Sequence, residues 1–354
     1  MSHPYADLPA AARWRAAVAR TDPAAPDGIW TPGFTLTPDA VFATAGSCFA
    51  QHVGRALRAA GLTLADAEPA PATLPPRLAA EHGYGLFSAR CGNVYTARQM
   101  AELLAEAATG TPDPRLIWTR DGRFRDALRP GVDPLGLDSA EEVLALRRDH
   151  LTRLAAMLPR VTHFIFTLGL TEGWQDAETG RALPVCPGVV AGRFDPARHR
   201  FTTARYPQIL DDLAEIRGRL RRFNPAMRLI LTVSPVPLSA TASGGHVLPA
   251  TTASKATLRA AAGDFAADHP DVDYFPAYEI VTNPAAGSRF YEPNLRDIRP
   301  EGVAAVMGAF FAGLGLTMPA ETAEPPPQPP SEAASYPHCE EALLDALHPT
   351  DNPA

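Results

Sequence analysis

Residues 41–61 read VFATAGSCFAQHVGRALRAAG, and this stretch predicts a strand, a tight turn and a helix in direct succession. The apolar run VFATA leads into Gly46, as a buried strand does. The next positions place apolar side chains on one face of a helix: Phe49, Val53, Leu57 and Ala60. Gly61 marks the end of that helix. The segment is the first unit of an alternating pattern of strands and helices.

The same alternation continues along the chain. Ser139 and Glu142 form a capping-box pattern for a helix that reaches about residue 158. Further predicted elements are strands over 163–170, 229–234 and 272–281 and helices over about 251–267 and 300–316. Another helix is predicted from the apolar stripe Ile209, Leu213, Ile216 and Leu220, and it stops at Asn224-Pro225. Strands separated by helices indicate an α/β fold with a doubly wound, mostly parallel sheet flanked by helices. In such sheets ligands bind beyond the carboxyl ends of the strands.

Composition divides the chain into a body over residues 1–316 and a tail over 317–354. The chain has 354 residues, of which 46% are hydrophobic and 20% charged, so the body can bury a full core. The tail contains EPPPQPP, seven of the 39 acidic residues and none of the 32 basic ones. The body is therefore neutral, and a nucleic-acid partner is not expected.

The tail is predicted to be disordered and partly extended. One part of it, EEALLDAL at 340–347, begins with acids and repeats leucine at helical spacing. It predicts a short helix that either folds into the groove of a protein partner or stays frayed.

Several site classes find no support in the sequence. No stretch approaches the roughly 18 apolar residues of a membrane span, and the first residues lack an apolar signal core, so a cytoplasmic protein is expected. Cysteines 48, 91, 186 and 339 lack metal-ligand spacing, so reduced thiols and no metal are expected. No Gly-x-Gly-x-x-Gly or Walker lysine follows a strand, so no nucleotide cofactor is expected.

The turn at 45–50 is the strongest candidate for chemistry. It places Ser47 and Cys48 at the N-terminus of a helix. The unpaired amides and the dipole there would lower the pKa of a thiol and stabilise an oxyanion. The alternative is a turn of small residues in which Cys48 is buried as a hydrophobic side chain.

The motif GSCFA at 46–50 resembles the motif for which the GSCFA-domain family is named. The resemblance extends over nearly the whole body, through YGLFSARCGNVYTARQ (84–99), FTLGLTEGW (166–174), PVCPG (184–188), LTVSPVPL (231–238), SKATLR (254–259) and YFPAYEI (274–280). That family is similar to a branch of the SGNH, or GDSL-like, hydrolase superfamily. The resemblance implies a flavodoxin-like three-layer sandwich.

The resemblance also implies a nucleophile. SGNH enzymes carry a Gly-Asp-Ser turn after the first strand, and Gly46, Ser47 and Cys48 match its three positions in order. The nucleophile's position falls on Cys48, with Ser47 as the alternative. A thiolate is the better nucleophile at neutral pH.

Two further blocks imply oxyanion or substrate contacts. Gly92 and Asn93 match the glycine block of the superfamily, and both are donors for an oxyanion. The Gly-x-Asn-Asp block matches GLTE from Gly169, with Thr171 in the place of Asn and Glu172 in the place of Asp. The alternative is that Thr171 and Glu172 only cap the next helix.

The late Asp-x-x-His block of SGNH enzymes is incomplete here. In RFYEPNLRDIRPEGV (289–303), Asn294 and Asp297 stand near the places of the acid and the histidine. No histidine lies between His269 and His338. The general base must therefore come from elsewhere in the chain.

Histidines elsewhere offer substitutes. His246, in the glycine-flanked loop after strand 229–234, lies beyond the carboxyl end of a strand and is the first choice. His52 is the second, because it follows Cys48 by one helical turn. His163, at the amino end of its strand, and His199, in a polar loop, are predicted to be structural or surface residues.

Three basic residues complete the candidates. Arg90 and Arg98 flank the glycine block and could bind a substrate carboxylate or phosphate. Lys255, the lone lysine, is predicted to lie at the surface, with a desolvated amine or an anion contact as the alternative.

The leading hypothesis is an acyl hydrolase or acyltransferase that forms a covalent acyl-enzyme on Cys48. An acylated carbohydrate or lipid is the substrate class that the resemblance implies. One alternative is a binding domain that kept the fold without catalysis, and another is an interaction protein that acts through its tail.

Overall fold

The computed structural model describes residues 3–318 and 343–344. Its centre is a five-stranded parallel sheet in the order β10-β9-β5-β1-β2. The strands are β1 (Val41–Gly46), β2 (Thr63–Leu64), β5 (His163–Leu168), β9 (Arg228–Val233) and β10 (Val272–Tyr274). Along the chain this is the 2-1-3-4-5 order of doubly wound folds, so the predicted fold class is confirmed.

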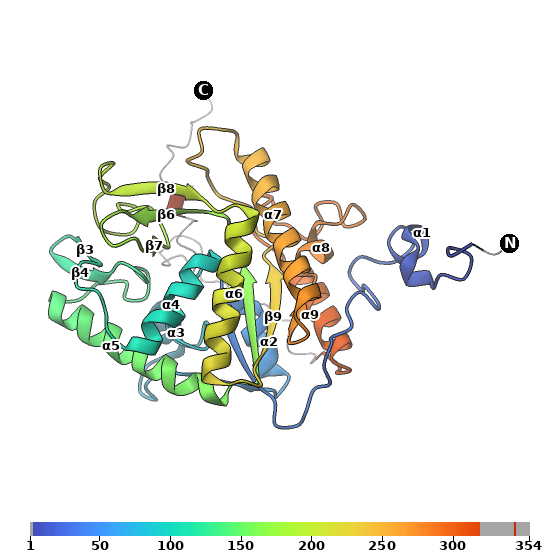
Figure 1. Cartoon of the computed structure of the whole chain (residues 1–354), viewed down its shortest axis with the longest axis horizontal. Helices are drawn as coiled ribbons and strands as arrows, with labels where there is room; N and C mark the ends of the chain where they lie inside the picture. The colour runs from blue at the N-terminus through green and yellow to red at the C-terminus, as the bar shows by residue number, and fades with distance from the viewer. Residues whose placement is uncertain (1–2, 319–342, 345–354) are drawn as a thin grey trace.

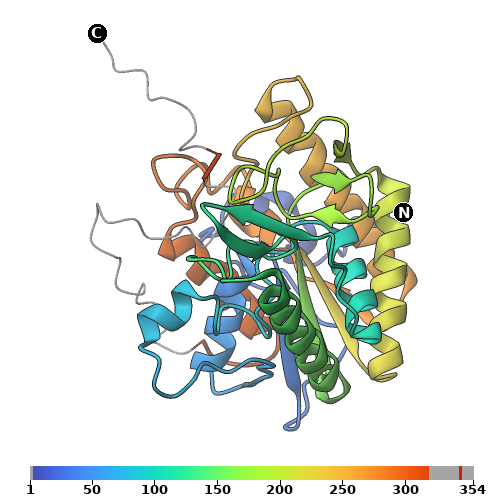
Figure 2. The same ribbon diagram turned by 90° about the vertical axis from the view of Figure 1, so that its left-hand side faces the viewer.

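Helices cover both faces of the sheet (Figures 1 and 2). Those of the described part are α1 (Trp14–Ala17), α2 (Ala50–Ala59), α3 (Pro76–Glu81), α4 (Ala97–Thr109), α5 (Ala140–Met157), α6 (Tyr206–Phe223), α7 (Val247–Asp268), α8 (Ala277–Thr282) and α9 (Pro300–Gly313), with short 3-10 turns η1 (Ala10–Ala12) and η2 (Leu158–Arg160). In the described part, no helix is long and apolar enough to cross a membrane.

Alternate side chains of each strand enter opposite cores. Phe164 and Phe166 of β5 pack into the core that α4, α5, α6 and α7 cover, whereas Ile165 packs into the core that α2, α8 and α9 cover. Side chains of a strand alternate between faces, so a sheet buried on both sides needs uninterrupted apolar strands. This is why the mostly apolar run at 163–168, buried at every position, identified a central strand.

An antiparallel lobe adjoins the sheet. It contains the β3 (Ile117–Arg120) and β4 (Arg123–Asp126) hairpin and a sheet in which β6 (Glu172–Asp176) lies between β7 (Ala182–Leu183) and β8 (His199–Thr203). Figure 1 shows β6 to β8 on the side toward which the arrow of β9 points. The lobe has its own apolar core, here called the lobe cluster, made of Tyr95, Leu116, Trp118, Ala127, Leu170, Leu183, Val185, Val190, Ala191 and Leu238.

Several element bounds differ from those expected. The strand predicted over 272–281 ends at Tyr274, and α8 follows, because Pro276 has no N–H with which to continue the ladder. His199 begins β8 and is not in a loop. Half of the predicted capping box is present: Ser139 Oγ accepts the Glu142 amide at 3.1 Å, whereas the Glu142 carboxylate accepts the amide of Asp138 instead of that of Ser139.

The predicted helix over 340–347 falls almost wholly outside the described residues. Only Leu343 and Leu344 are described, and both are helical. Leu343 is half-buried and packs against the lobe cluster.

Candidate active site at the end of the central strands

The turn between β1 and α2 is held tightly against the end of β5. Gly46 has φ +142°, and a Cβ atom there would lie 2.5 Å from the Thr167 carbonyl oxygen, so only glycine fits. The Ala50 amide donates to the Ser47 carbonyl at 2.9 Å as α2 begins. The backbone is thereby forced to turn at the carboxyl edge of two neighbouring central strands.

Ser47 and Cys48 differ in their environments. Ser47 is only 3% exposed, and among the described residues its Oγ has no hydrogen-bond partner. Gly169 presses against it, since a Cβ on that glycine would lie 3.1 Å from the Ser47 Cβ. Cys48 is half-buried and packs against both the α2-side core and the lobe cluster. The thiol is thus the more accessible of the two side chains.

The segment with Gly92 and Asn93 lies beside the same turn. The Val94 amide donates to the Gly46 carbonyl at 2.9 Å, and the Gly169 amide donates to the Tyr95 carbonyl at 3.0 Å. Gly92 adopts φ +68°, which favours glycine, and Asn93 is buried. Backbone hydrogen bonds therefore bring the three sequence blocks together.

Helix α7 holds the loop after β5 from the other side. Lys255 is 1% exposed, and its Nζ donates to the Gly169 carbonyl at 2.7 Å. Ser254 Oγ accepts the Thr171 amide at 3.0 Å. The predicted surface position of Lys255 is therefore wrong.

A sequence signal for the burial of Lys255 does exist. The buried face of α7 repeats at helical spacing and includes the lysine: Ser254, Lys255, Leu258, Ala261, Ala262 and Phe265. A lysine on such a stripe must lead its amine to a polar partner, because an ammonium buried without one is costly.

His246, the first choice for the base, is the N-cap of α7. It is exposed, and its Nδ1 accepts the Leu248 amide at 3.1 Å, so the neutral ring carries its proton on Nε2. The adjacent Val247 packs against the lobe cluster, as Cys48 does.

His52, the second choice, lies on α2 with its Nδ1 3.1 Å from Arg55 Nη2. Burial and the Arg55 charge lower its pKa to about 3, so the ring is neutral and weakly basic.

The remaining candidates fall in different places. Arg90 is buried, with its guanidinium 3.0 Å from Asp133 and over the ring of Tyr84, so it is held inside the protein. Glu172 begins β6 and accepts the Thr241 hydroxyl at 2.8 Å, and burial raises the pKa of its carboxyl.

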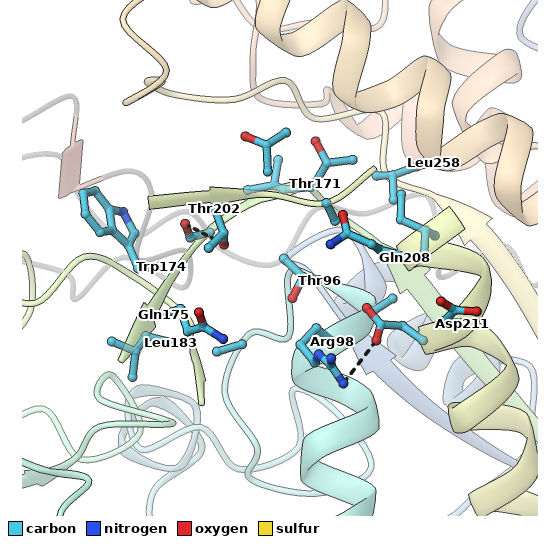
Figure 3. A pocket seen from close by; sticks show the side chains of 18 residues that line it. Thr96, Arg98, Thr171, Trp174, Gln175, Leu183, Thr202, Gln208, Asp211 and Leu258 are labelled. Carbon is cyan, nitrogen blue, oxygen red and sulfur yellow. Dashed lines mark hydrogen bonds and ion pairs between the residues drawn. The ribbon is translucent and has the colours of Figure 1, made fainter. Parts of the chain in front are cut away.

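Arg98 and Thr171 line a pocket of about 260 Å³ between α4, α6 and the lobe (Figure 3). Arg98 Nη1 lies 3.4 Å from Asp212, whose pKa rises to about 6 because it is buried and lies near Glu215 and Asp211. In the same pocket, no sequence motif pointed to Asp212, and Trp174, the last residue of the segment 166–174, was given no role from the sequence.

A buried ionic network lies under α4 and α5. His150 Nδ1 is 2.6 Å from Glu68, and Arg147 Nη2 is 2.6 Å from Glu106. Arg129 and Asp126 connect these two pairs through contacts of 3.8, 2.9 and 3.5 Å. Within residues 3–318 and 343–344, no group of acidic, histidine and cysteine side chains could hold a metal ion.

One comparison with known proteins agrees with the motif at the turn. The model of the GSCFA family matches residues 41–310. Among curated proteins, none matches the chain in sequence. A solved structure, a carbohydrate esterase family 3 protein from Talaromyces cellulolyticus, is similar over 77% of this chain and 94% of its own, at 11% identity and a TM-score of 0.35.

Proposed function

Since the chain belongs to the GSCFA family, we propose that it is an acyl hydrolase or acyltransferase with Cys48 as its nucleophile. One observation carries the proposal. The half-exposed thiol stands in the turn between a central strand and a helix, where the blocks at 92–95 and 169–171 also meet. Donors and a nucleophile are thereby collected at the carboxyl edge of the sheet, where doubly wound folds bind their ligands.

In the proposed reaction the Cys48 sulfur attacks the carbonyl carbon of an ester while the base takes the thiol proton. The bond from that carbon to the alcohol oxygen breaks, the base returns the proton to the alcohol, and a thioester remains. Water or an acceptor alcohol then attacks the thioester with help from the same base, which restores the thiol. An acylated carbohydrate or lipid is the proposed substrate.

His246 is the proposed base, and His52 the alternative. His246 adjoins Val247, which shares the lobe cluster with Cys48. To accept a proton on Nε2, its ring must first move the proton to Nδ1 and release the Leu248 amide. His52 is limited for a different reason, because a pKa of about 3 makes it a poor proton acceptor at neutral pH.

The proposed oxyanion donors are the Gly92 amide and the Asn93 side chain. The Thr171 amide is bound to Ser254, so only the hydroxyl of Thr171 is available to a ligand. The ammonium of Lys255, through the Gly169 carbonyl, holds the loop that carries Thr171. Preorganised donors of this kind stabilise the charge that develops on the carbonyl oxygen.

A panel of acyl p-nitrophenyl esters tests the proposal. Intact-mass measurement should find one acyl adduct, and peptide mapping should place it on Cys48. Ser47→Ala is the matched control and should keep the adduct, because the Ser47 hydroxyl is buried. An adduct on Ser47 would reverse the assignment, and no adduct or turnover with any ester would refute it.

A binding domain without catalysis is the second candidate. The observation that favours it is the late block, where Asn294 Nδ2 donates to Asp297 at 2.9 Å and no histidine is present. Thiol labelling across pH separates the two functions. A Cys48 thiol that titrates well below the usual range near 8.5 supports catalysis, whereas an ordinary thiol supports binding alone.

A further inference from the structure

The C-terminal segment EEALLDAL, at 340–347, makes a contact that the proposed chemistry does not use. Its described residues, Leu343 and Leu344, are helical. Leu343 is half-buried and packs against the lobe cluster, as Cys48 does. Figures 1 and 2 both show the short red ribbon of these two residues beside the lobe. The segment therefore meets its own chain in the region that holds the candidate nucleophile.

The sequence of this segment has one apolar face. In an α-helix, Leu347 follows Leu343 by one turn and shares its face, whereas Glu341 and Asp345 fall on the opposite face. Isolated helices shorter than about 12–15 residues are marginal in water. A helix over 340–347 therefore depends on a surface that covers its apolar face.

The lobe offers apolar side chains for such a contact. Half-buried side chains from separate segments pack against the lobe cluster beside Leu343: Leu128, Trp174, Val189 and Val247. Phe194, which meets the Trp174 ring edge-on at 5.3 Å between centroids, is exposed. An amphipathic helix is recognised by laying its apolar face on side chains of this kind.

The charges near Val189 and Val247 suit an acidic helix. The segments that carry them, PVCPGVVAGRF (184–194) and SATASGGHVL (239–248), contain no acidic residue, and Arg193 of the first is exposed. Glu172 lies beside the second segment, where its carboxylate accepts the Thr241 hydroxyl at 2.8 Å. The acids of the helix thus meet an exposed guanidinium and no acid within either segment.

The chain itself favours its own tail as the occupant of this surface. Met318 packs against the α2-side core, and residues 319–342 connect it to Leu343. A flexible polypeptide of that length has an end-to-end distance of ~25–30 Å, which compares with a radius of gyration of ~20 Å for a domain of this size. A tether that reaches its site gives an effective concentration in the millimolar range, above that of a second copy in dilute solution.

We propose that residues 340–347 dock as an amphipathic helix on the lobe of their own chain, with Leu343 against the lobe cluster beside Cys48, and form a lid over the candidate active site. A substrate must displace this helix to reach the thiol. The docking stands on the Leu343 contact, and the effect of the lid on turnover rests on the proposed function.

Hydrogen exchange of the full chain, read by mass spectrometry, tests the docking. Peptides that cover 340–347 should exchange at least ~10-fold more slowly than an unfolded chain, because a helix this short is protected only when it is docked. Leu343→Asp should remove the protection. Leu344→Asp is the matched control and should keep most of it, since this position lies off the face that Leu343 and Leu347 share. Exchange of the natural sequence at the unfolded rate would refute the docking.

Protein concentration distinguishes the chain's own tail from that of a second copy. Protection of 340–347 should stay constant over a wide range of concentration, and light scattering should give the mass of a monomer. Protection that rises with concentration together with a dimer would show that the helix docks on a neighbouring molecule, which would overturn the proposal. Protection that appears only when another protein is added would overturn it as well.

A peptide added in trans tests the lid. EEALLDALHPT, the sequence of 340–350, is added to the Leu343→Asp chain at a concentration near the effective one of the tether. It should slow iodoacetamide labelling of Cys48, read by peptide mapping, toward the rate of the natural sequence. The same peptide with aspartate at the position of Leu343 is the control and should leave the rate unchanged. Equal rates with both peptides would refute the lid.

Kinetics with the ester panel separate this inference from the proposed function. If both hold, Leu343→Asp should raise kcat/KM severalfold. An unchanged kcat/KM in a variant that has lost its protection would refute the lid. An acyl adduct on Cys48 with an unprotected segment would refute the docking and leave the nucleophile in place, whereas a protected segment without any adduct would support the docking and refute the enzyme.

Discussion

Two regions of the molecule bring a cysteine close to charged or polar groups, and they differ in what surrounds the thiol. Cys91 is 5% exposed, and burial together with the charge of Glu68 raises the pKa of its thiol to about 12. Cys48 is half-buried at a turn made of backbone amides and small residues, next to a pocket. The first region resembles a salt-bridged core, and the second a place where a ligand can arrive.

Shifted pKa values alone would favour the buried network over the Cys48 turn as a candidate site. The buried network contains Glu68, whose pKa is lowered to about 2: burial raises it, but the contacts with His150, Arg129 and the Arg90 amide together outweigh burial. It also contains His150, with a pKa lowered to about 4 by burial and by Arg129. These buried groups bind one another by hydrogen bonds and ion pairs, so their pKa shifts come from a structural network and do not by themselves indicate a functional site. A catalytic site differs from such a network because a ligand can reach its nucleophilic side chain.

The largest expected effect concerns the two thiols. Cys48→Ala should lower kcat/KM for an activated ester at least ~1,000-fold, as loss of a covalent nucleophile does. Cys91→Ala is the matched change and should leave activity within a few fold of the natural sequence. The measurement is initial-rate kinetics on both purified variants. Activity lost with Cys91→Ala and kept with Cys48→Ala would invert the comparison.

The next effect tests the structural role of the network. Arg147→Met should lower the free energy of unfolding by ~2–4 kcal/mol, because it removes the buried charged hydrogen bonds of Arg147 to Glu106 and leaves Glu106 and Asp126 with one cation each, Arg181 and Arg129. Arg153→Met, at an exposed pair with Asp149, should cost at most ~1 kcal/mol. Urea denaturation measures both. Equal changes in the free energy of unfolding would show that burial does not determine how much these ion pairs contribute to stability.

Replacement of the proposed base should lower the rate less than loss of the proposed nucleophile does. His246→Gln should lower kcat ~100-fold with little change in the free energy of unfolding, because the side chain is exposed. His52→Gln is the comparison, and we expect little loss of kcat. A silent His246→Gln with a damaging His52→Gln would place the base on α2.

A fall in pH should destabilise the protein through protonation of His150 in the buried network. Its pKa is about 4 in the folded state and near 6.5 in the unfolded chain, so the unfolded state binds more protons between these values. Stability should therefore fall as pH drops from about 6.5 to about 4, by up to ~1.4 kcal/mol per pH unit from this group. His150→Gln should remove that slope, which urea denaturation at several pH values can measure. An unchanged slope would exclude His150 as its source.

The smallest effect concerns the contact of Leu343 with the lobe cluster, against which Cys48 and Trp174 also pack. Leu343→Asp should cost about 1 kcal/mol of stability, because a half-buried leucine loses part of its apolar contact. It should also speed iodoacetamide labelling of Cys48 severalfold. Leu344→Asp is the adjacent control, and identical labelling of both variants and the natural sequence would show that the contact does not cover the thiol.

The candidate site was only partly predictable. Gly46, Ser47 and Cys48 form one continuous motif, so their turn could be located from the sequence. Lys255 could not be placed so easily, because its partner is the carbonyl of Gly169, 86 positions earlier. The pocket residue Asp212 carries no motif, and it meets the lobe residues only when the lobe packs beside α6.

The sequence by itself determined the α/β class, the buried central strands and the position of the turn that carries Ser47 and Cys48. These follow from local patterns, since side-chain periodicity and a glycine at a sharp turn act over a few residues. Tertiary structure alone decided which charges meet in the core, as Glu68 and His150 do across 82 positions, and where a pocket opens beside Thr171. Such partners are chosen by the packing of distant elements, because a buried charge is stable only where the fold brings its counterpart within reach.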